Sequence, residues 1–87
     1  MELFVIMKYN DGDIIRYVLV SFAFGNPSWY YDLDDEIEVG DMVLVSYRHQ
    51  EQQGIVSQVV RCVYPYVVYP INKTLPVFEI VKKAEKK

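Results

Sequence analysis

The side chains with the clearest binding chemistry in this sequence are tyrosine, tryptophan and arginine. Tyr47 is followed by Arg48, Trp29 is followed by Tyr30, and Arg61 lies near a further tyrosine. An aromatic ring beside a guanidinium can stack on a nucleobase or on a partner's side chain, with a cation–π attraction of about 0.5–2 kcal/mol. The predicted binding residues are therefore Trp29, Tyr30, Tyr47, Arg48 and Arg61.

The eight tyrosines leave three roles open: core packing, a protein interface, or nucleic-acid stacking. Tyrosine suits protein interfaces because it combines apolar area with a polar tip. Binding to a nucleic-acid backbone needs several phosphate contacts from Lys or Arg. The net charge of −3 and a pI near 5.0 oppose that role. For Trp29, plugging the end of the barrel is an equal alternative to a binding role. For Arg48, neutralising a nearby acid is an equal alternative.

Little in the sequence points to catalysis or to a metal. The single cysteine, Cys62, lies in an apolar run and is expected to be buried and inert. The single histidine, His49, lies in a polar stretch without a fixed acid beside it. The sequence has no nucleophile elbow, phosphate-binding loop or Cys-x-x-Cys motif. We expect a protein that is not an enzyme and that has no cofactor and no metal site.

Acidic residues are concentrated in one part of the chain. Six lie from Asp32 to Asp41, and residues 17–47 contain no Lys or Arg, whereas residues 48–87 hold seven of these bases. The spacing of the acids does not match a helix–loop–helix calcium site, which favours a solvated loop. Two outcomes remain open for the charges: a dipolar surface, or neutralisation between neighbouring strands.

Apolar runs rich in β-branched and aromatic residues predict the strands that must position these side chains. Asp11-Gly12 predicts a tight hairpin between the first two strands, both of whose faces are apolar. That hairpin is therefore either central or covered by a partner chain. The last segment, 77–83, is a strand or a short helix, with strand favoured. The predicted strands are 3–9, 14–23, 29–33, 42–48, 55–64 and 77–83, with the polar residues 49–54 as a turn.

Five or six short strands without a helical pattern predict an all-β fold, an SH3-like barrel, with an OB-like barrel as the alternative. The 87 residues, 52% of them hydrophobic, suit one small domain over 1–83 with a fraying basic tail over 84–87. Gly40 and Gly54 precede apolar strands and should tolerate side chains poorly, with Gly40 at positive φ. The expected core is Val5, Ile6, Val18, Leu19, Val20, Tyr31, Val43, Val45, Ile55, Val56, Val59 and Val60.

Residues 29–60 carry a resemblance to known proteins. Trp-Tyr-Tyr-Asp-Leu at 29–33, Val-Gly-Asp-Met-Val-Leu-Val at 39–45 and Gly-Ile-Val at 54–56 follow a recurrent small-barrel pattern. This pattern resembles the core of the N-terminal DNA-binding domain of the primosomal replication-restart helicase. It is also similar to small proteins of bacteria and their phages. Tyr30 stands where the helicase domain has an acidic residue for recognising a strand's 3′ end.

Two functions follow as expectations. The first is a non-catalytic protein-interaction module, phage- or prophage-encoded, that binds a host or viral protein in the cytoplasm without involvement of a membrane. The acidic stretch and the apolar first hairpin favour it, and an exposed edge strand over 3–9 would allow a homodimer. The alternative is a barrel that binds single-stranded nucleic acid, which the helicase resemblance implies.

Overall fold

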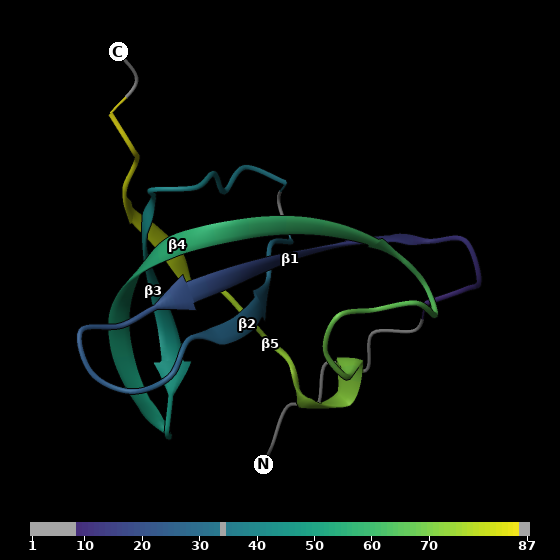
Figure 1. The fold of residues 1–87 in the computed structure, drawn as a ribbon, viewed down its shortest axis with the longest axis horizontal. Coiled ribbons are helices and arrows are strands. Elements are labelled where there is room, and N and C mark those ends of the chain that lie inside the picture. Colours follow the sequence, from purple (N-terminus) through teal and green to yellow (C-terminus); the bar gives the residue numbers. More distant parts are fainter. Residues whose placement is uncertain (1–8, 34, 86–87) are drawn as a thin grey trace.

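The computed structural model describes residues 9–33 and 35–85, and these form one all-β unit (Figure 1). The predicted small barrel fold with five or six strands is confirmed, and the end segment is a strand rather than a helix. In chain order the elements are β1 (Ile14–Ser21), β2 (Ser28–Tyr31), β3 (Met42–Tyr47), β4 (Gln50–Val63), the 3₁₀ helix η1 (Ile71–Lys73), β5 (Leu75–Pro76) and β6 (Glu79–Lys82).

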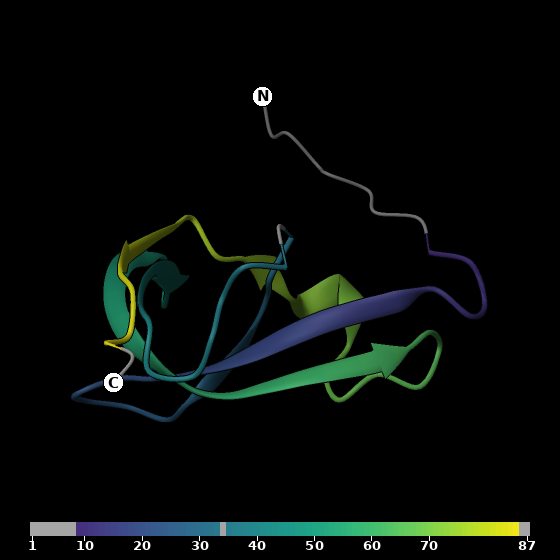
Figure 2. The same cartoon turned by 90° about the horizontal axis from the view of Figure 1, so that it is seen from above.

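The six strands form a single strongly curled sheet in the order β5-β2-β1-β4-β3-β6. β1 and β4 make a long antiparallel ribbon, visible in both views (Figures 1 and 2). β5 pairs parallel with β2, and β6 pairs antiparallel with β3. Between them, Val77 N donates to Tyr31 O and Phe78 N donates to Leu44 O. Residues 75–82 therefore bond to β2 at one end and to β3 at the other, and so connect the two sides of the curled sheet.

β1 is the central strand, and both of its faces are buried. Tyr17 and Val18 point to opposite sides of the sheet, and neither has any exposed surface. The inner cluster around Val18 includes Tyr30 and Ile37, and the outer cluster around Tyr17 is covered by the segment 64–74. The apolar character of both faces thus reflects a central strand, which was one of the two predicted alternatives.

The predicted core is right at the central positions and wrong at the margins. Ile55 is 42% exposed, because it lies where β4 changes partner from β3 to β1. Leu19, Val59 and Val60 are only partly buried, and Val5 and Ile6 lie outside the described residues. The core residues predicted correctly are Val18, Val20, Tyr31, Val43, Val45 and Val56, and those missed are Ile15, Tyr17, Tyr30 and Ile37. Cys62 is buried, as expected.

The hairpin between β3 and β4 turns earlier than predicted. Tyr47 pairs with Gln50, so Arg48 and His49 alone make the turn, at φ 51° and 64°. Two consecutive positive φ values are typical of a type I′ turn, which usually takes Asn-Gly. The prediction of a polar turn over 49–54 is wrong, because residues 50–53 extend β4 along an exposed edge.

The first predicted strand, 3–9, falls almost entirely outside the described residues. β1 itself has β4 on one edge and β2 on the other over Tyr17–Val20. The hairpin pairing predicted across Asp11-Gly12 is therefore wrong at these positions, where β2 occupies the edge. Gly12 N instead donates to Tyr64 O, next to the end of β4.

The two glycines singled out in the sequence are both constrained, for different reasons. Gly40 has φ +94° in the turn before β3, as predicted. Gly54 has no positive φ, but a Cβ there would overlap Val20 Cγ1 and lie 2.9 Å from Ser21 O. The backbones of β4 and β1 approach so closely here that only glycine fits without a shift.

Candidate functional site

Two of the predicted binding residues belong to the packing of the barrel. Tyr30 is 4% exposed in the inner cluster, and its hydroxyl donates to Ser46 O at 2.8 Å. Burial raises the pKa of Tyr30 above its ordinary value. Trp29 packs edge-on against Tyr17, with ring centroids 6.2 Å apart, and reaches solvent in a separate shallow groove beside Lys73. Trp29 and Arg48 line different grooves.

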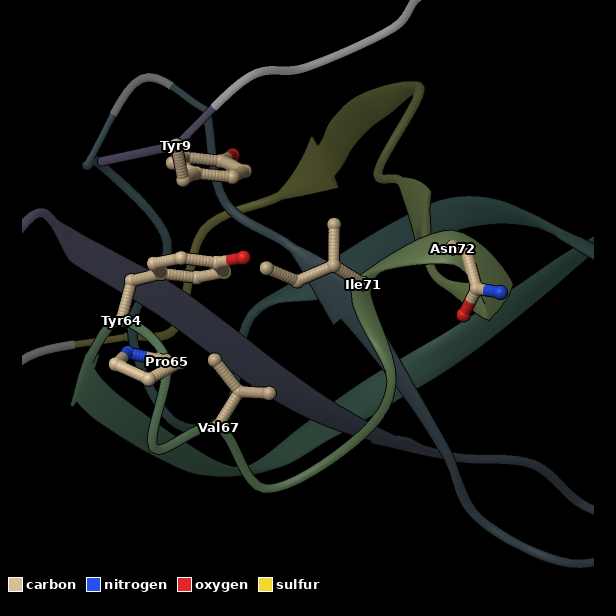
Figure 3. Close-up of a pocket in the computed structure, with 6 residues that line it drawn as sticks. All are labelled: Tyr9, Tyr64, Pro65, Val67, Ile71 and Asn72. Atoms are coloured by element: carbon tan, nitrogen blue, oxygen red, sulfur yellow. The ribbon is translucent and has the colours of Figure 1, made fainter. Parts of the chain in front are cut away.

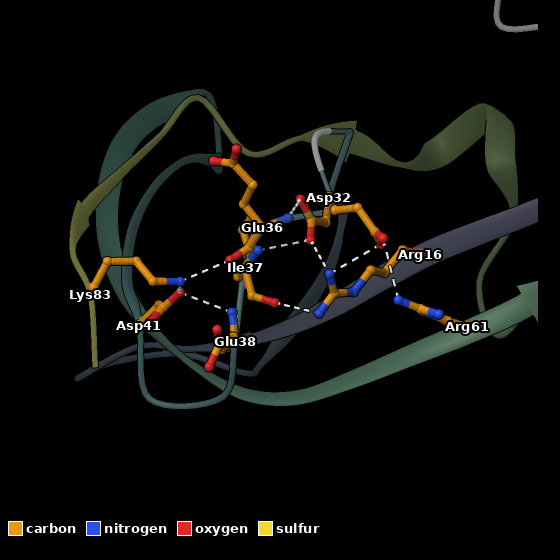
Figure 4. Close-up of polar contacts among 9 residues, drawn as sticks. Arg16, Asp32, Glu36, Ile37, Glu38, Asp41, Arg61 and Lys83 are labelled. Atoms are coloured by element: carbon orange, nitrogen blue, oxygen red, sulfur yellow. Dashed lines mark hydrogen bonds and ion pairs between the residues drawn. The ribbon is translucent and has the colours of Figure 1, made fainter. Parts of the chain in front are cut away.

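Arg61 lies at the far end of β4 from the hairpin turn and belongs to an ion-pair network (Figure 4). Its guanidinium is 3.3 Å from Asp35, which also contacts Arg16 at 3.1 Å. Arg16 in turn lies 3.1 Å from Asp32 and donates to Ile37 O at 2.6 Å. The Arg16 and Arg61 guanidiniums thus hold the 32–41 loop against the β1–β4 ribbon. Arg61 therefore belongs to this ion-pair network.

Asp41 anchors the other end of the same loop (Figure 4). Its buried carboxylate accepts from Lys83 Nζ at 2.5 Å, from Ala84 N at 2.7 Å and from Glu38 N at 2.8 Å. Burial opposes ionisation, but these donors outweigh it and lower the pKa of Asp41. Ala84, where the tail was expected to fray, is therefore tied down by its amide.

The loop from Asp32 to Asp41 is thus not simply a solvated acidic loop. Asp32 and Asp35 face bases from β1 and β4, and Asp41 faces Lys83 just after β6, which is the predicted outcome of charge neutralisation. Within residues 9–33 and 35–85, no three His, Cys, Asp or Glu side chains are grouped so that they could hold a metal ion.

Tyr47 and Arg48 do come together, at the tip of the β3–β4 hairpin. The Tyr47 ring stacks on Phe22 with centroids 4.2 Å apart and an interplanar angle of 30°. The Arg48 guanidinium carbon lies 5.4 Å from the centre of the Tyr47 ring, within cation–π range. Phe22 and Arg48 thus both lie against the Tyr47 ring, and we call this group the Phe22–Tyr47–Arg48 stack.

The loop after β1 forms the other wall of this site. Gly25 has φ +92°, and a Cβ there would overlap the Tyr47 hydroxyl, so the loop can pack on Tyr47 only with glycine. Next to it, Phe24 is 88% exposed. Between loop and hairpin lies a groove of about 260 Å³, which we call the tip groove, lined by Phe22, Ala23, Phe24, Gly25, Tyr47, Arg48, Gln50, Gln52 and Gln53.

The tip groove is suited to binding rather than to acid–base chemistry. Its lining combines aromatic rings, carboxamides and one guanidinium, and contains no carboxylate or thiol. His49 is exposed at the turn beside it. Strained backbone at consecutive non-glycine residues costs about 1–3 kcal/mol each and is concentrated at functional sites. Arg48 and His49 meet that description.

A second groove, of about 330 Å³, lies on the outer face under the 64–74 segment (Figure 3). The rings of Tyr9 and Tyr64 face each other with centroids 6.0 Å apart, and the Ile71 side chain points toward them. Burial raises the pKa of Tyr9. This groove contains none of the predicted binding residues and has no charged side chain in its lining.

Sequence reasoning missed Phe22 and Phe24, which are two of the three aromatic residues that line the tip groove. One signal was available, because Phe-Ala-Phe-Gly at 22–25 places two large apolar side chains beside a turn glycine.

Comparisons of the chain with protein-family models, curated proteins and solved structures gave no match. The helicase resemblance stays a prediction. In the described part of the chain, no helix has the length and apolar character needed to cross a membrane.

Proposed function

We propose that this protein is a non-catalytic protein-interaction module that binds its partner through the tip groove. The observation that carries the proposal is the fully projecting Phe24, 88% exposed, beside the Phe22–Tyr47–Arg48 stack. Aromatic residues and arginine are the side chains that contribute most of the binding energy at protein interfaces. A projecting phenylalanine on a loop held by Gly25 offers such an anchor at low entropic cost.

The distribution of charge favours a protein over a nucleic acid. Three of the described bases, Arg16, Arg61 and Lys83, are paired with acids of the 32–41 loop. The other three, Arg48, Lys73 and Lys82, lie on a hairpin turn, a 3₁₀ helix and β6. Strong binding to a nucleic-acid backbone needs several neighbouring phosphate contacts. Three bases on separate elements do not form such a row.

Capture of a partner by tagged variants tests the proposal. Phe24→Ser and Arg48→Glu each remove part of the tip groove's exposed surface, and both should reduce capture from a lysate at least tenfold at unchanged melting temperature. Lys82→Glu makes the same charge change on β6 and serves as the matched control, which should bind as the wild type does.

Three outcomes would contradict the proposal. Capture that survives Phe24→Ser and Arg48→Glu would place the binding surface elsewhere. Loss of capture by Lys82→Glu as well would indicate a response to overall charge. Binding of single-stranded DNA oligonucleotides below 10 µM (about −7 kcal/mol) in low salt, lost in Arg48→Glu, would replace the proposal by the nucleic-acid alternative.

A further inference from the structure

One wall of the tip groove is an open edge of the sheet. In the two-residue hairpin, Tyr47 and Gln50 are paired directly across the turn, so the backbone groups of Gln50, Gln52 and Gly54 face β3. Val56 N, which donates to Asp41 O, continues the same alternation. The backbone N–H and C=O groups of Glu51 and Gln53 therefore point away from β3.

That edge is where β1 would lie if it were longer. β1 ends at Ser21, opposite Ile55, and the chain then leaves the sheet at Phe22 to form the loop. Among the described residues, no backbone hydrogen bond outside the strand ladders reaches Glu51 or Gln53. Both residues are exposed. Two residues of β4 thus present unpaired donors and acceptors directly beside the tip groove.

The space left by β1 has the chemistry of a peptide groove. An extended chain placed there would pair with Glu51 and Gln53, as in the addition of a strand to a sheet edge. Alternate side chains of that chain would point to the inner side, where Phe22 and Tyr47 supply apolar surface and Gln52 supplies carboxamide groups. Toward the turn, Arg48 and His49 are exposed and favour an acidic residue.

We propose that the partner enters the tip groove as an extended peptide segment that adds a strand to β4 at Glu51 and Gln53. The segment carries an apolar or aromatic residue that packs between Phe24 and Tyr47, and an acidic residue toward Arg48. This inference rests on the proposed function and specifies its mode of recognition: main-chain hydrogen bonds for affinity, and two side-chain positions for specificity.

A displayed library of random heptapeptides, selected on the wild-type protein, provides the probe. Enriched peptides should share an apolar residue and an acidic residue. Their affinity should fall about tenfold or more in Gln53→Pro, which removes an N–H from the open edge and leaves the β3 ladder intact. Gln53→Thr keeps the N–H, changes the side chain and serves as the matched control; it should lose less than threefold.

Amide hydrogen exchange of the wild-type protein gives a readout that does not depend on the folding of a proline variant. Adding an enriched peptide should slow exchange at Glu51 and Gln53 at least tenfold, while Gln50 and Gln52, already bonded to β3, change little. Enrichment of no peptide, or unchanged exchange at Glu51 and Gln53 with peptide bound, overturns the inference. The proposed function then still stands if Phe24→Ser and Arg48→Glu abolish partner capture, and falls if they do not.

Discussion

The carboxylate of Asp41 and the ammonium of Lys83 lie 2.5 Å apart although 42 residues separate them in the chain. The Asp41 side chain has no exposed surface, whereas that of Lys83 is about half exposed. The pair joins the turn before β3 to the segment after β6. Because Asp41 also accepts from the amides of Glu38 and Ala84, one buried carboxylate fixes the backbone on both sides of this contact.

Stability should depend on the ionisation of Asp41 in acid. Its pKa is lowered in the folded protein, so its contribution is complete above about pH 4, the ordinary carboxyl value, and is lost as the pH falls through the lower folded pKa. Asp41→Asn should lower the free energy of unfolding by about 1–3 kcal/mol at pH 7. The difference from the wild type should shrink below pH 4. Urea unfolding from pH 2.5 to 7 measures it, and a constant difference would contradict the assignment.

Four buried tyrosines should resist ionisation in the folded protein. Burial raises the pKa of Tyr9, Tyr17, Tyr30 and Tyr31, the last most strongly. For these raised groups the neutral form is favoured by folding, so their contribution holds below pH 10 and is lost as the pH rises through the folded values. Absorbance at 295 nm should show these four phenols ionising above the ordinary phenol value of about 10, together with unfolding. Their ionisation at the ordinary value in the folded protein would contradict the buried environment.

The strained turn should be easy to stabilise. Replacing Arg48-His49 with Asn-Gly supplies the residues that a type I′ turn favours and should raise the free energy of unfolding by about 1–2 kcal/mol. If the strain is retained for binding, His49→Gly alone should keep partner capture, whereas Arg48→Asn should weaken it. Denaturant midpoints and capture of the two single variants separate the effects. Loss of stability in both would mean that the turn is not strained.

Alanine at Gly54 and at Gly12 should be costly for different reasons. Gly12 has φ +96° and open space around it, so Gly12→Ala adds backbone strain alone, about 1 kcal/mol. Gly54→Ala adds overlap with Val20 and should cost about 1–3 kcal/mol. In a Val20→Ala background the cost of Gly54→Ala should fall, while that of Gly12→Ala stays constant. A double-mutant cycle by chemical denaturation tests this, and additive costs at Gly54 would refute the close approach.

The fold was predictable where burial imposes a period of two. Val43 and Val45 alternate with half-buried neighbours, and the apolar run from Tyr17 to Val20 marks a strand buried on both faces. The turn at Arg48-His49 was not predictable, because arginine is not typical of positive φ and the pair is not one of the usual type I′ sequences. The start of β4 at Gln50 was missed for a related reason: on an open, exposed edge, polar residues form a strand without any hydrophobic pattern.

The candidate site was predictable only in part. Tyr47 and Arg48 are adjacent in sequence, and their proximity in space follows from that alone. Tyr30 and Arg61 were assigned to the site because their residue types suit binding, but pairing across strands placed them in the core and against Asp35. Such long-range partners depend on strand order, and sequence spacing carries no information about it.

The bridge formed by residues 75–82 has a consequence for synthesis on the ribosome. β1 to β4 are translated first, yet β2 and β3 keep unpaired edges until Leu75–Lys82 has left the exit tunnel and bonded to both. A nascent chain stalled before that point exposes two unpaired strand edges at once, and such edges are prone to pair with neighbouring chains. The speed of translation through this short segment therefore sets how long the nascent protein is vulnerable to aggregation through these edges.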